Sequence, residues 1–258
     1  MTTAVAHSWF MTLRHLRALL RQPWWIAITL VQPVIWLLIF SQLFRRVVEI
    51  PGFASTSYIT FLTPGIVVMT ALFSNGWSGM GVIDDLNRGV MDRFLVTPVR
   101  RGAVISGRLV QSAIVTTVQA LIIIGLGLAG GARFGGGLPG IVALLLAGAL
   151  LGVAFGALSN ALALLLRREE SVIAASNFIL LPLTFLSTAF MPQDLAPDWI
   201  GHVARYNPVN WAIVAGREAL QADVGWMTVF SHLGYLAVFA VVCGWLATRA
   251  FRTYQRSV

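Results

Sequence analysis

The sequence contains no lysine; all 18 of its basic residues are arginine. A P-loop uses a lysine to reach the β and γ phosphates of a nucleotide, so the chain has no ordinary Walker A motif. A Schiff base on a lysine amine is excluded for the same reason. The single cysteine, Cys243, lies in an apolar run and excludes both an intrachain disulfide and a cysteine-based metal cluster. These absences exclude a P-loop, a lysine Schiff base and a cysteine-based metal cluster, and our expectation for this chain is no catalytic residue, no metal site and no cofactor.

Charged residues are also scarce, because they make up 11% of the 258 residues, against about 25% in a typical soluble domain. Hydrophobic residues make up 57%, which is more apolar surface than a soluble fold of this length can bury. A bilayer accepts such surface when each apolar run reaches about 20 residues. The composition predicts an all-α, polytopic membrane protein with a single transmembrane domain over residues 1–258.

Six apolar runs, none with an Asp, Glu or Arg, are the predicted spans: Trp24–Phe44, Tyr58–Val82, Leu109–Ala132, Pro139–Leu166, Val172–Phe190 and Phe230–Thr248. A helix of 21 residues is about 31 Å long and crosses the hydrocarbon core. Pro33, Pro64 and Pro182 are expected to kink spans one, two and five. Ion-coupled transporters usually need titratable groups at membrane depth, so any transport here must take its energy from elsewhere.

The arginines predict the orientation of the spans. Thirteen of the eighteen lie in the N-terminal segment, in 83–108, at 167–168 and in the C-terminal tail, and five lie on the opposite side. The positive-inside rule places both termini in the cytoplasm. The net charge of +8 is then a topological signal, and we expect no nucleic acid as a partner.

Three segments outside the spans carry a pattern. Residues 8–22 place Trp9 and three leucines on one helical face, which predicts an amphipathic helix at the cytoplasmic interface. Residues 83–108 form the longest cytoplasmic loop, with an apolar stripe that either docks into a cytoplasmic partner or rests on the headgroups as a solvated connector. Residues 191–229 predict two external helices, about 197–206 and 209–220, that lie at the outer interface or re-enter it.

Two short motifs allow more than one interpretation. Gly76-Trp77-Ser78-Gly79, together with His232, has the residue types of an intramembrane serine protease, although the predicted topology separates Ser78 from His232 by much of the bilayer. Gly148, Gly152 and Gly156 have the spacing that lets helix backbones approach closely, within one chain or between two.

Polar residues within the spans either bond neighbouring helices or line a substrate path. They are Gln32, Asn75, Gln119, Asn160 and Asn177, with Thr70, Thr116, Thr117, Thr184 and Ser187.

Three stretches together resemble the permease subunit of type-2 ABC exporters, the group that includes daunorubicin-resistance-type efflux permeases. They are the amphipathic helix before span one, the loop 85–101 with its Thr97-Pro98 turn and the following Ser106–Leu109, and the stretch Leu181–Pro192 followed by Trp199 and Asn207–Trp211. Arg108 stands where lysine is common in the family. The match in order and spacing covers essentially the whole chain.

The resemblance implies partners for the chain. A separate ABC ATPase, with ATP and Mg²⁺ in that subunit, would bind the coupling helix after span two. A second permease chain, identical or different, would pair with this one in the bacterial plasma membrane. The residues implied in coupling are Asp84, Asp85, Arg88, Met91, Asp92, Arg93, Phe94, Leu95, Thr97 and Pro98.

The resemblance also implies a substrate path between the permeases, along spans one, two and five. The residues implied are Gln32, Thr70, Phe73, Asn75, Asn177, Phe178, Leu181, Thr184 and Phe185. Their uncharged, aromatic character favours an amphipathic drug or a lipid-like molecule as the substrate, moved out of the cell. Related families export polysaccharides, other lipids or sodium, and these alternatives stay open together with the protease.

Overall fold

The structure is a computed structural model that describes residues 23–50, 53, 57–88 and 101–255. All regular elements within these residues are helices: α2 (Pro23–Leu43), η1 (Arg45–Glu49), α3 (Tyr58–Gly76), α4 (Met80–Asn87), α6 (Arg101–Ala129), α7 (Gly137–Leu166), α8 (Glu169–Phe185), η2 (Gln193–Leu195), α9 (Asp198–Ala204), α10 (Pro208–Leu220) and α11 (Trp226–Gln255). The predicted interfacial helix 8–22 lies outside the described residues. The same holds for part of the predicted coupling set, namely Met91, Asp92, Arg93, Phe94, Leu95, Thr97 and Pro98.

Four helical segments in the described part of the chain are long and apolar enough to cross a membrane: Tyr58–Asn87, Gly107–Ala129, Gly137–Leu166 and Trp226–Arg252. The apolar part of α2, Ile28–Leu43, is shorter, and α8 has 17 residues. These lengths fit a polytopic membrane protein, and six spans remain a prediction. The helices α2, α3 and α8 each continue through their internal proline.

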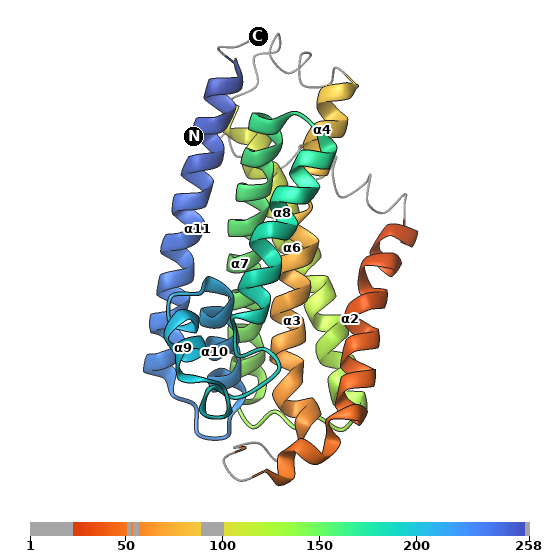
Figure 1. Ribbon diagram of the computed structural model, residues 1–258, viewed down its shortest axis with the longest axis vertical. Helices are drawn as coiled ribbons and strands as arrows, with labels where there is room; N and C mark the ends of the chain where they lie inside the picture. The colour runs from red at the N-terminus through yellow and green to blue at the C-terminus, as the bar shows by residue number, and fades with distance from the viewer. Residues whose placement is uncertain (1–22, 51–52, 54–56, 89–100, 256–258) are drawn as a thin grey trace.

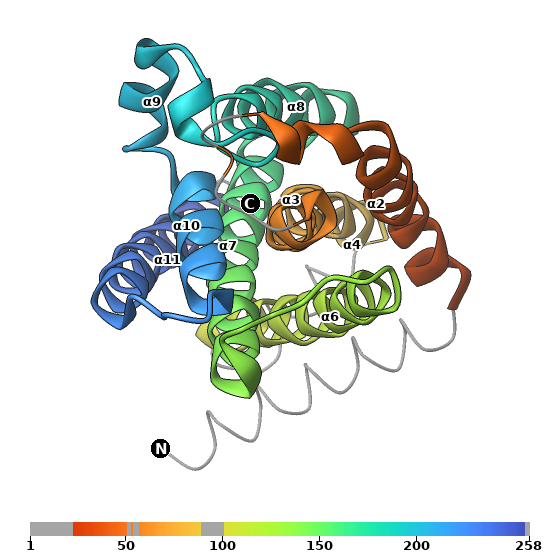
Figure 2. The same cartoon turned by 90° about the horizontal axis from the view of Figure 1, so that it is seen from below.

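Helix α7 forms the centre of the bundle and packs against α3, α6, α10 and α11 (Figures 1 and 2). Glycines allow the close approach of the neighbouring helices. A Cβ atom at Gly140 would lie 2.0 Å from the Ala219 carbonyl oxygen of α10, and one at Gly152 would lie 2.6 Å from Asn75 Nδ2 of α3. The nearest neighbours of Gly148 and Gly156 also include residues of α3 and α6. Gly148, Gly152 and Gly156 of α7 therefore face other parts of the same chain.

The second predicted span is interrupted at residues 77–79, between α3 and α4. Hydrogen bonds from two other helices satisfy groups that the interruption frees. Gly79 N donates to Ser159 Oγ of α7 at 2.9 Å, Ser176 Oγ of α8 donates to Gly76 O at 3.1 Å, and Ser78 Oγ donates to Gly156 O at 3.4 Å. The glycines at both ends of this motif thus permit contact with α7 and α8.

This geometry gives no support to a Ser78–His232 dyad. The Ser78 hydroxyl is bonded to the backbone of α7. The ring of His232 bonds through Nδ1 to Thr228 O at 2.8 Å and contacts the ring of Tyr235 edge-on. Neither side chain therefore uses the other as a hydrogen-bond partner, which a serine nucleophile and its base would require.

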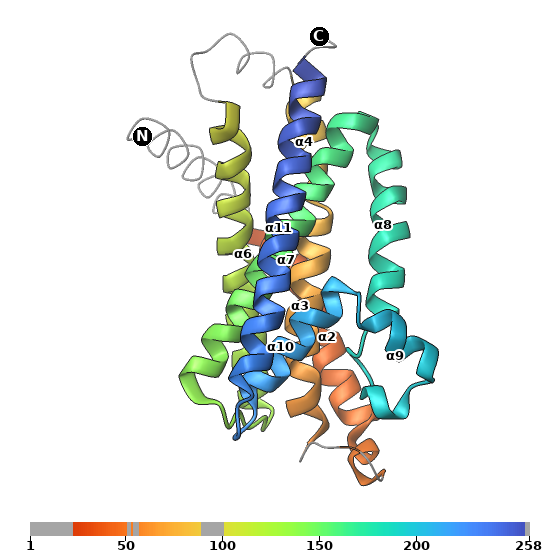
Figure 3. The ribbon, with the colours of Figure 1, turned by 90° about the vertical axis from the view of Figure 1, so that its left-hand side faces the viewer.

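The end of the bundle opposite α4 is formed by the chain that leaves α8, turns into α9 and α10, and returns through α11 (Figure 3). Asn207 Nδ2 donates to Leu183 O at 2.7 Å and to Leu186 O at 2.9 Å, while its Oδ1 accepts from Val209 N and caps α10. Asn210 Oδ1 accepts bonds from both Thr188 N and Thr188 Oγ1. These two asparagines attach the start of α10 to the end of α8.

Arg217 of α10 joins the same region to α3. Its guanidinium donates to Ala189 O at 2.9 Å and, at 3.3 Å each, to Thr188 Oγ1 and Phe61 O. The guanidinium carbon also lies 3.6 Å from the centre of the Phe61 ring, a cation–π contact. Burial lowers the pKa of Arg217 to about 9, and the neighbouring Tyr58 acts in the opposite direction. The side chain is still protonated at neutral pH.

We expect Arg217→Gln to lower the free energy of unfolding by about 2 kcal/mol, because carbonyl oxygens lose a charged donor and the cation–π contact disappears. For a chain of this length the melting temperature should fall by about 4–8 °C. Thermal unfolding of the purified chain in detergent measures this shift. Arg205→Gln is the matched control, since Arg205 is exposed on the same segment. Equal melting temperatures for the two variants would contradict the role given to Arg217.

Candidate functional site

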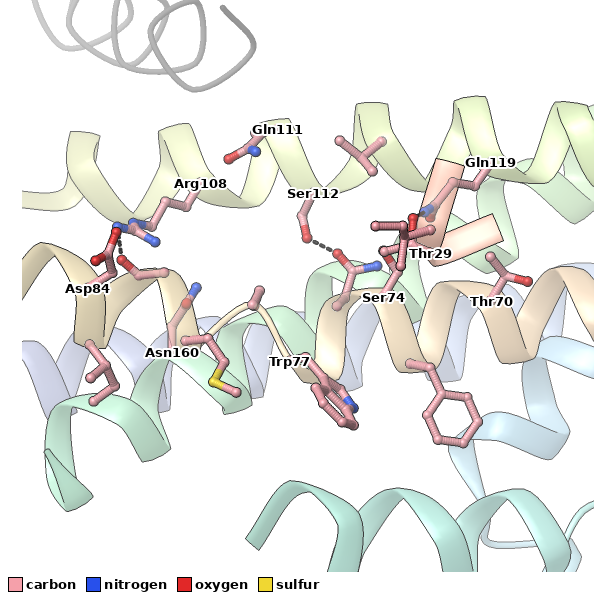
Figure 4. Close-up of a pocket in the computed structure, with 18 of the residues that line it drawn as sticks. Thr29, Thr70, Ser74, Trp77, Asp84, Arg108, Gln111, Ser112, Gln119 and Asn160 are labelled. Atoms are coloured by element: carbon pink, nitrogen blue, oxygen red, sulfur yellow. Dashed lines mark hydrogen bonds between the residues drawn. The ribbon is translucent and has the colours of Figure 1, made fainter. Parts of the chain in front are cut away.

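A cavity of about 1010 Å³ lies between α2, α3, α4 and α6 (Figure 4). Its wall combines apolar side chains with neutral polar ones, and its charged groups come from α4, from Arg108 of α6 and from Glu169, the first residue of α8. The polar residues that line it without charge are Thr29, Gln32, Thr70, Ser74, Asn75, Ser78, Asn87, Gln111, Ser112, Gln119 and Asn160.

The structure brings together one part of the residues predicted for a substrate path. Gln32, Thr70, Phe73 and Asn75 all line this cavity. The five predicted residues of α8 do not, since Phe178 is 82% and Phe185 64% exposed on the outer side of the chain. Leu181 is exposed as well, Asn177 is partly buried, and Thr184 is buried with its hydroxyl bonded to Leu180 O. The α8 residues thus stay predicted lining for a path between two chains.

Asn75 serves mainly to join helices at the cavity wall. Its Nδ2 donates to Ala71 O and to Thr116 Oγ1, both at 2.7 Å, and its Oδ1 accepts from Ser112 Oγ of α6. Gly152 of α7 lies directly against this amide. The side chain is buried and its hydrogen-bonding capacity is used within the chain, so it connects α3 to α6.

The third predicted span contributes a wall that the resemblance did not imply. Gln111, Ser112, Val115 and Gln119 of α6 face the cavity. Gln119 Nε2 donates to Thr29 Oγ1 of α2 at 3.1 Å, which connects α6 to α2 at the cavity wall. Gln119 could be singled out in the sequence as a polar residue within an apolar run. The sequence pattern does not show which helix its side chain faces.

The α4 end of the cavity carries the charges. Asp84 pairs with Arg88 at 2.9 Å on the exposed side of α4, and Asp85 pairs with Arg108 of α6, a partly buried ion pair. Arg108 also donates to Gly81 O at 3.3 Å. The three described residues of the predicted coupling set therefore lie at the cavity rim, and Asp85 ties α4 to α6.

The arrangement has the chemistry of a binding site. No group of three or more His, Cys, Asp or Glu that could hold a metal ion occurs in the described ranges. Away from the α4 end, the described lining offers hydrogen-bonding amides and hydroxyls beside Trp36, Met69 and Phe73. Apolar surface with a few placed polar groups is typical of sites for small organic molecules. The described helices and the cavity together indicate a multi-pass membrane protein with a space for a small organic molecule.

Comparison with known proteins identifies the family. Residues 44–249 match the family model described as ABC-2 family transporter protein, so the chain belongs to this family. The daunorubicin resistance ABC transporter permease protein DrrB1 of Streptomyces coeruleorubidus is 30% identical over 214 residues, which cover 81% of this chain and 74% of that protein.

Two further relatives come from other lineages. The putative transport permease ycf38 of Cyanophora paradoxa is 30% identical over 87% of this chain and 77% of its own length. The probable doxorubicin resistance ABC transporter permease protein DrrC of Mycobacterium tuberculosis (strain ATCC 25618 / H37Rv) is 24% identical over 83% of this chain and 76% of its own. The predicted resemblance to type-2 ABC permeases and to the daunorubicin-resistance group is confirmed.

Proposed function

We propose that the chain is the membrane-spanning permease subunit of an ATP-powered exporter, and that it moves an amphipathic drug or lipid-like molecule out of the cell. A separate ABC ATPase binds it from the cytoplasm and holds the ATP and Mg²⁺. The chain crosses the bacterial plasma membrane six times with both termini in the cytoplasm, and it pairs with a second permease chain.

The observation that carries the proposal is the cavity, which lies in a chain whose sequence has no lysine for a P-loop. Two named relatives are permeases for resistance to daunorubicin or doxorubicin, which are drugs of the proposed class. The cavity volume of about 1010 Å³ suits a molecule of that size. The sequence has no lysine for a P-loop, and the charged residues that line the cavity lie at its α4 end. ATP hydrolysis in a partner subunit supplies what this chain lacks.

The proposal is tested by co-expressing the chain with a partner ABC ATPase and preparing inside-out vesicles. Daunorubicin uptake should require both proteins and ATP, and it should stop when the Walker A lysine of the ATPase is replaced by alanine. A proton or sodium ionophore should leave the initial rate unchanged. ATP-independent uptake by the purified chain alone, or uptake that the ionophore abolishes, would refute the proposal.

A further inference from the structure

Several polar side chains around the cavity already have hydrogen-bond partners within the fold. The Asn75 amide bonds to α3 and α6, and the Thr70 hydroxyl donates to Ile66 O at 2.7 Å. A side chain with satisfied hydrogen bonds gains little from a ligand, because binding would have to replace bonds that already exist. Polar atoms of the lining that have no partner gain most from a ligand, and they are the better candidates for recognition.

Two buried oxygen atoms meet that condition. Gln119 Oε1 and Asn160 Oδ1 have no hydrogen-bond partner in the part of the chain that the structure describes, and these side chains are 1% and 5% exposed. Buried acceptors in folded proteins are nearly always bonded, so an exception calls for a reason. Both residues line the same cavity. Gln119 Nε2 donates to Thr29 Oγ1, so the amide oxygen is the atom of this side chain that lacks a partner.

The two acceptors lie at different depths. In Figure 4 Asn160 lies toward Arg108 and Asp84, and Gln119 lies toward Thr29 and Thr70. Arg108 and Gln119 are eleven residues apart on α6, which corresponds to about 16 Å along the helix. The lining also includes the apolar side chains of Met69, Phe73 and Val115. An occupant that satisfies both oxygens is elongated, with an apolar body and hydrogen-bond donors at separate positions.

The charged groups of the cavity lining limit the chemical class of molecule that can occupy the cavity. Arg88 and Arg108 are already paired with Asp84 and Asp85, and Glu169 adds a further carboxylate at the same end. A carboxylate or phosphate would meet acceptor oxygens at depth and paired arginines at the rim. A neutral or cationic molecule with N–H or O–H donors meets complementary groups throughout.

We propose that Gln119 determines substrate specificity in a binding site that lies within a single chain, between α2, α3 and α6. Its Oε1 accepts a hydrogen bond from a donor group of a neutral or cationic amphipathic substrate, and Asn160 Oδ1 offers a second acceptor nearer the α4 end. This inference rests on the proposed export function and adds the substrate class and the residue that selects it.

The test compares two probes on the full chain in lipid nanodiscs by isothermal titration calorimetry. Daunorubicin carries ammonium and hydroxyl donors, whereas tetraphenylphosphonium is a bulky apolar cation with none. Gln119→Leu should weaken daunorubicin binding about fivefold, the effect of one lost hydrogen bond, and should leave tetraphenylphosphonium binding within twofold. Gln119→Glu, which keeps the acceptor, should bind daunorubicin at least as tightly as the unchanged chain.

Thr117→Val is the matched control, because Thr117 lies on the same helix, is not part of the cavity lining, and donates its hydroxyl hydrogen to Ala113 O. It should change neither dissociation constant by more than twofold. Equal weakening of both probes by Gln119→Leu, or an unchanged constant for daunorubicin, would overturn the inference. If the unchanged chain and Gln119→Leu export daunorubicin equally with the ATPase, the inference fails and the export function stands. If selective binding is found without ATP-driven export, the export function fails alone.

Discussion

Gly140→Ala is expected to destabilise the protein by about 3 kcal/mol, at the upper end of the usual cost of overpacking. The added methyl group would lie 2.0 Å from the Ala219 carbonyl oxygen and 2.9 Å from its carbonyl carbon. These are backbone atoms of α10, so no side-chain rotation relieves the clash and the two helices must separate. The melting temperature of the purified chain should fall by about 6–12 °C.

Gly148→Ala, eight residues further along α7, is the matched control. Its nearest neighbours are side-chain atoms 3.8–3.9 Å from the added Cβ atom, which is ordinary van der Waals contact. Alanine is also the better helix former by about 1 kcal/mol, so Gly148→Ala should be neutral or slightly stabilising. If both variants melted at the same temperature, α7 and α10 would not approach each other as closely as the structure shows.

The helices were largely predictable because each apolar run is long and ends at charged residues or glycines. The position of the interruption in the second span was not. We expected Pro64 to kink this span, and α3 continues through Pro64 to Gly76; the break at 77–79 contains no proline. That break depends on Ser159 of α7 and Ser176 of α8, which lie far away in sequence and whose hydrogen bonds no local pattern reveals.

The lining of the cavity was also only partly predictable from the sequence. Gln32, Thr70 and Asn75 stand out in the sequence as polar residues in apolar runs, and they line the space in the structure. Gln119 stands out equally, but polarity alone does not tell which neighbouring helix a side chain meets. Its role as a wall of the cavity follows from the packing of α2 across α3 and α6, which is a tertiary property. The predicted path residues of α8 do not line this cavity. Their sequence pattern cannot distinguish a surface that faces a second chain from one that faces lipid.

The second large effect concerns the link between the cavity and the proposed ATPase. The loop whose apolar stripe includes Phe94 and Leu95 joins α4 to α6, and both helices line the cavity. The ion pair between Asp85 and Arg108 ties these helices at the rim. A displacement of the loop by a cytoplasmic partner would therefore reach two walls of the cavity together. This connection gives a physical reason for the coupling role that the resemblance implied.

Replacing Phe94 and Leu95 together with aspartate should lower ATP-driven daunorubicin transport at least tenfold, while the ATPase subunit continues to hydrolyse ATP. Two carboxylates in the proposed apolar docking surface would carry a desolvation cost well above the 1.4 kcal/mol that a tenfold loss requires. Transport and hydrolysis are measured on the same proteoliposomes, so that the ratio of drug moved to ATP consumed reports coupling directly.

The matched control keeps the surface apolar with Phe94→Leu and Leu95→Met, which should preserve both co-purification with the ATPase and the transport ratio. The aspartate variant should in addition retain its melting temperature, because the loop lies outside the packed bundle in the predicted topology. Normal co-purification and an unchanged transport ratio in the aspartate variant would mean that the ATPase acts through another surface. In that case the tie between Asp85 and Arg108 would hold the cavity rim together without transmitting motion into it.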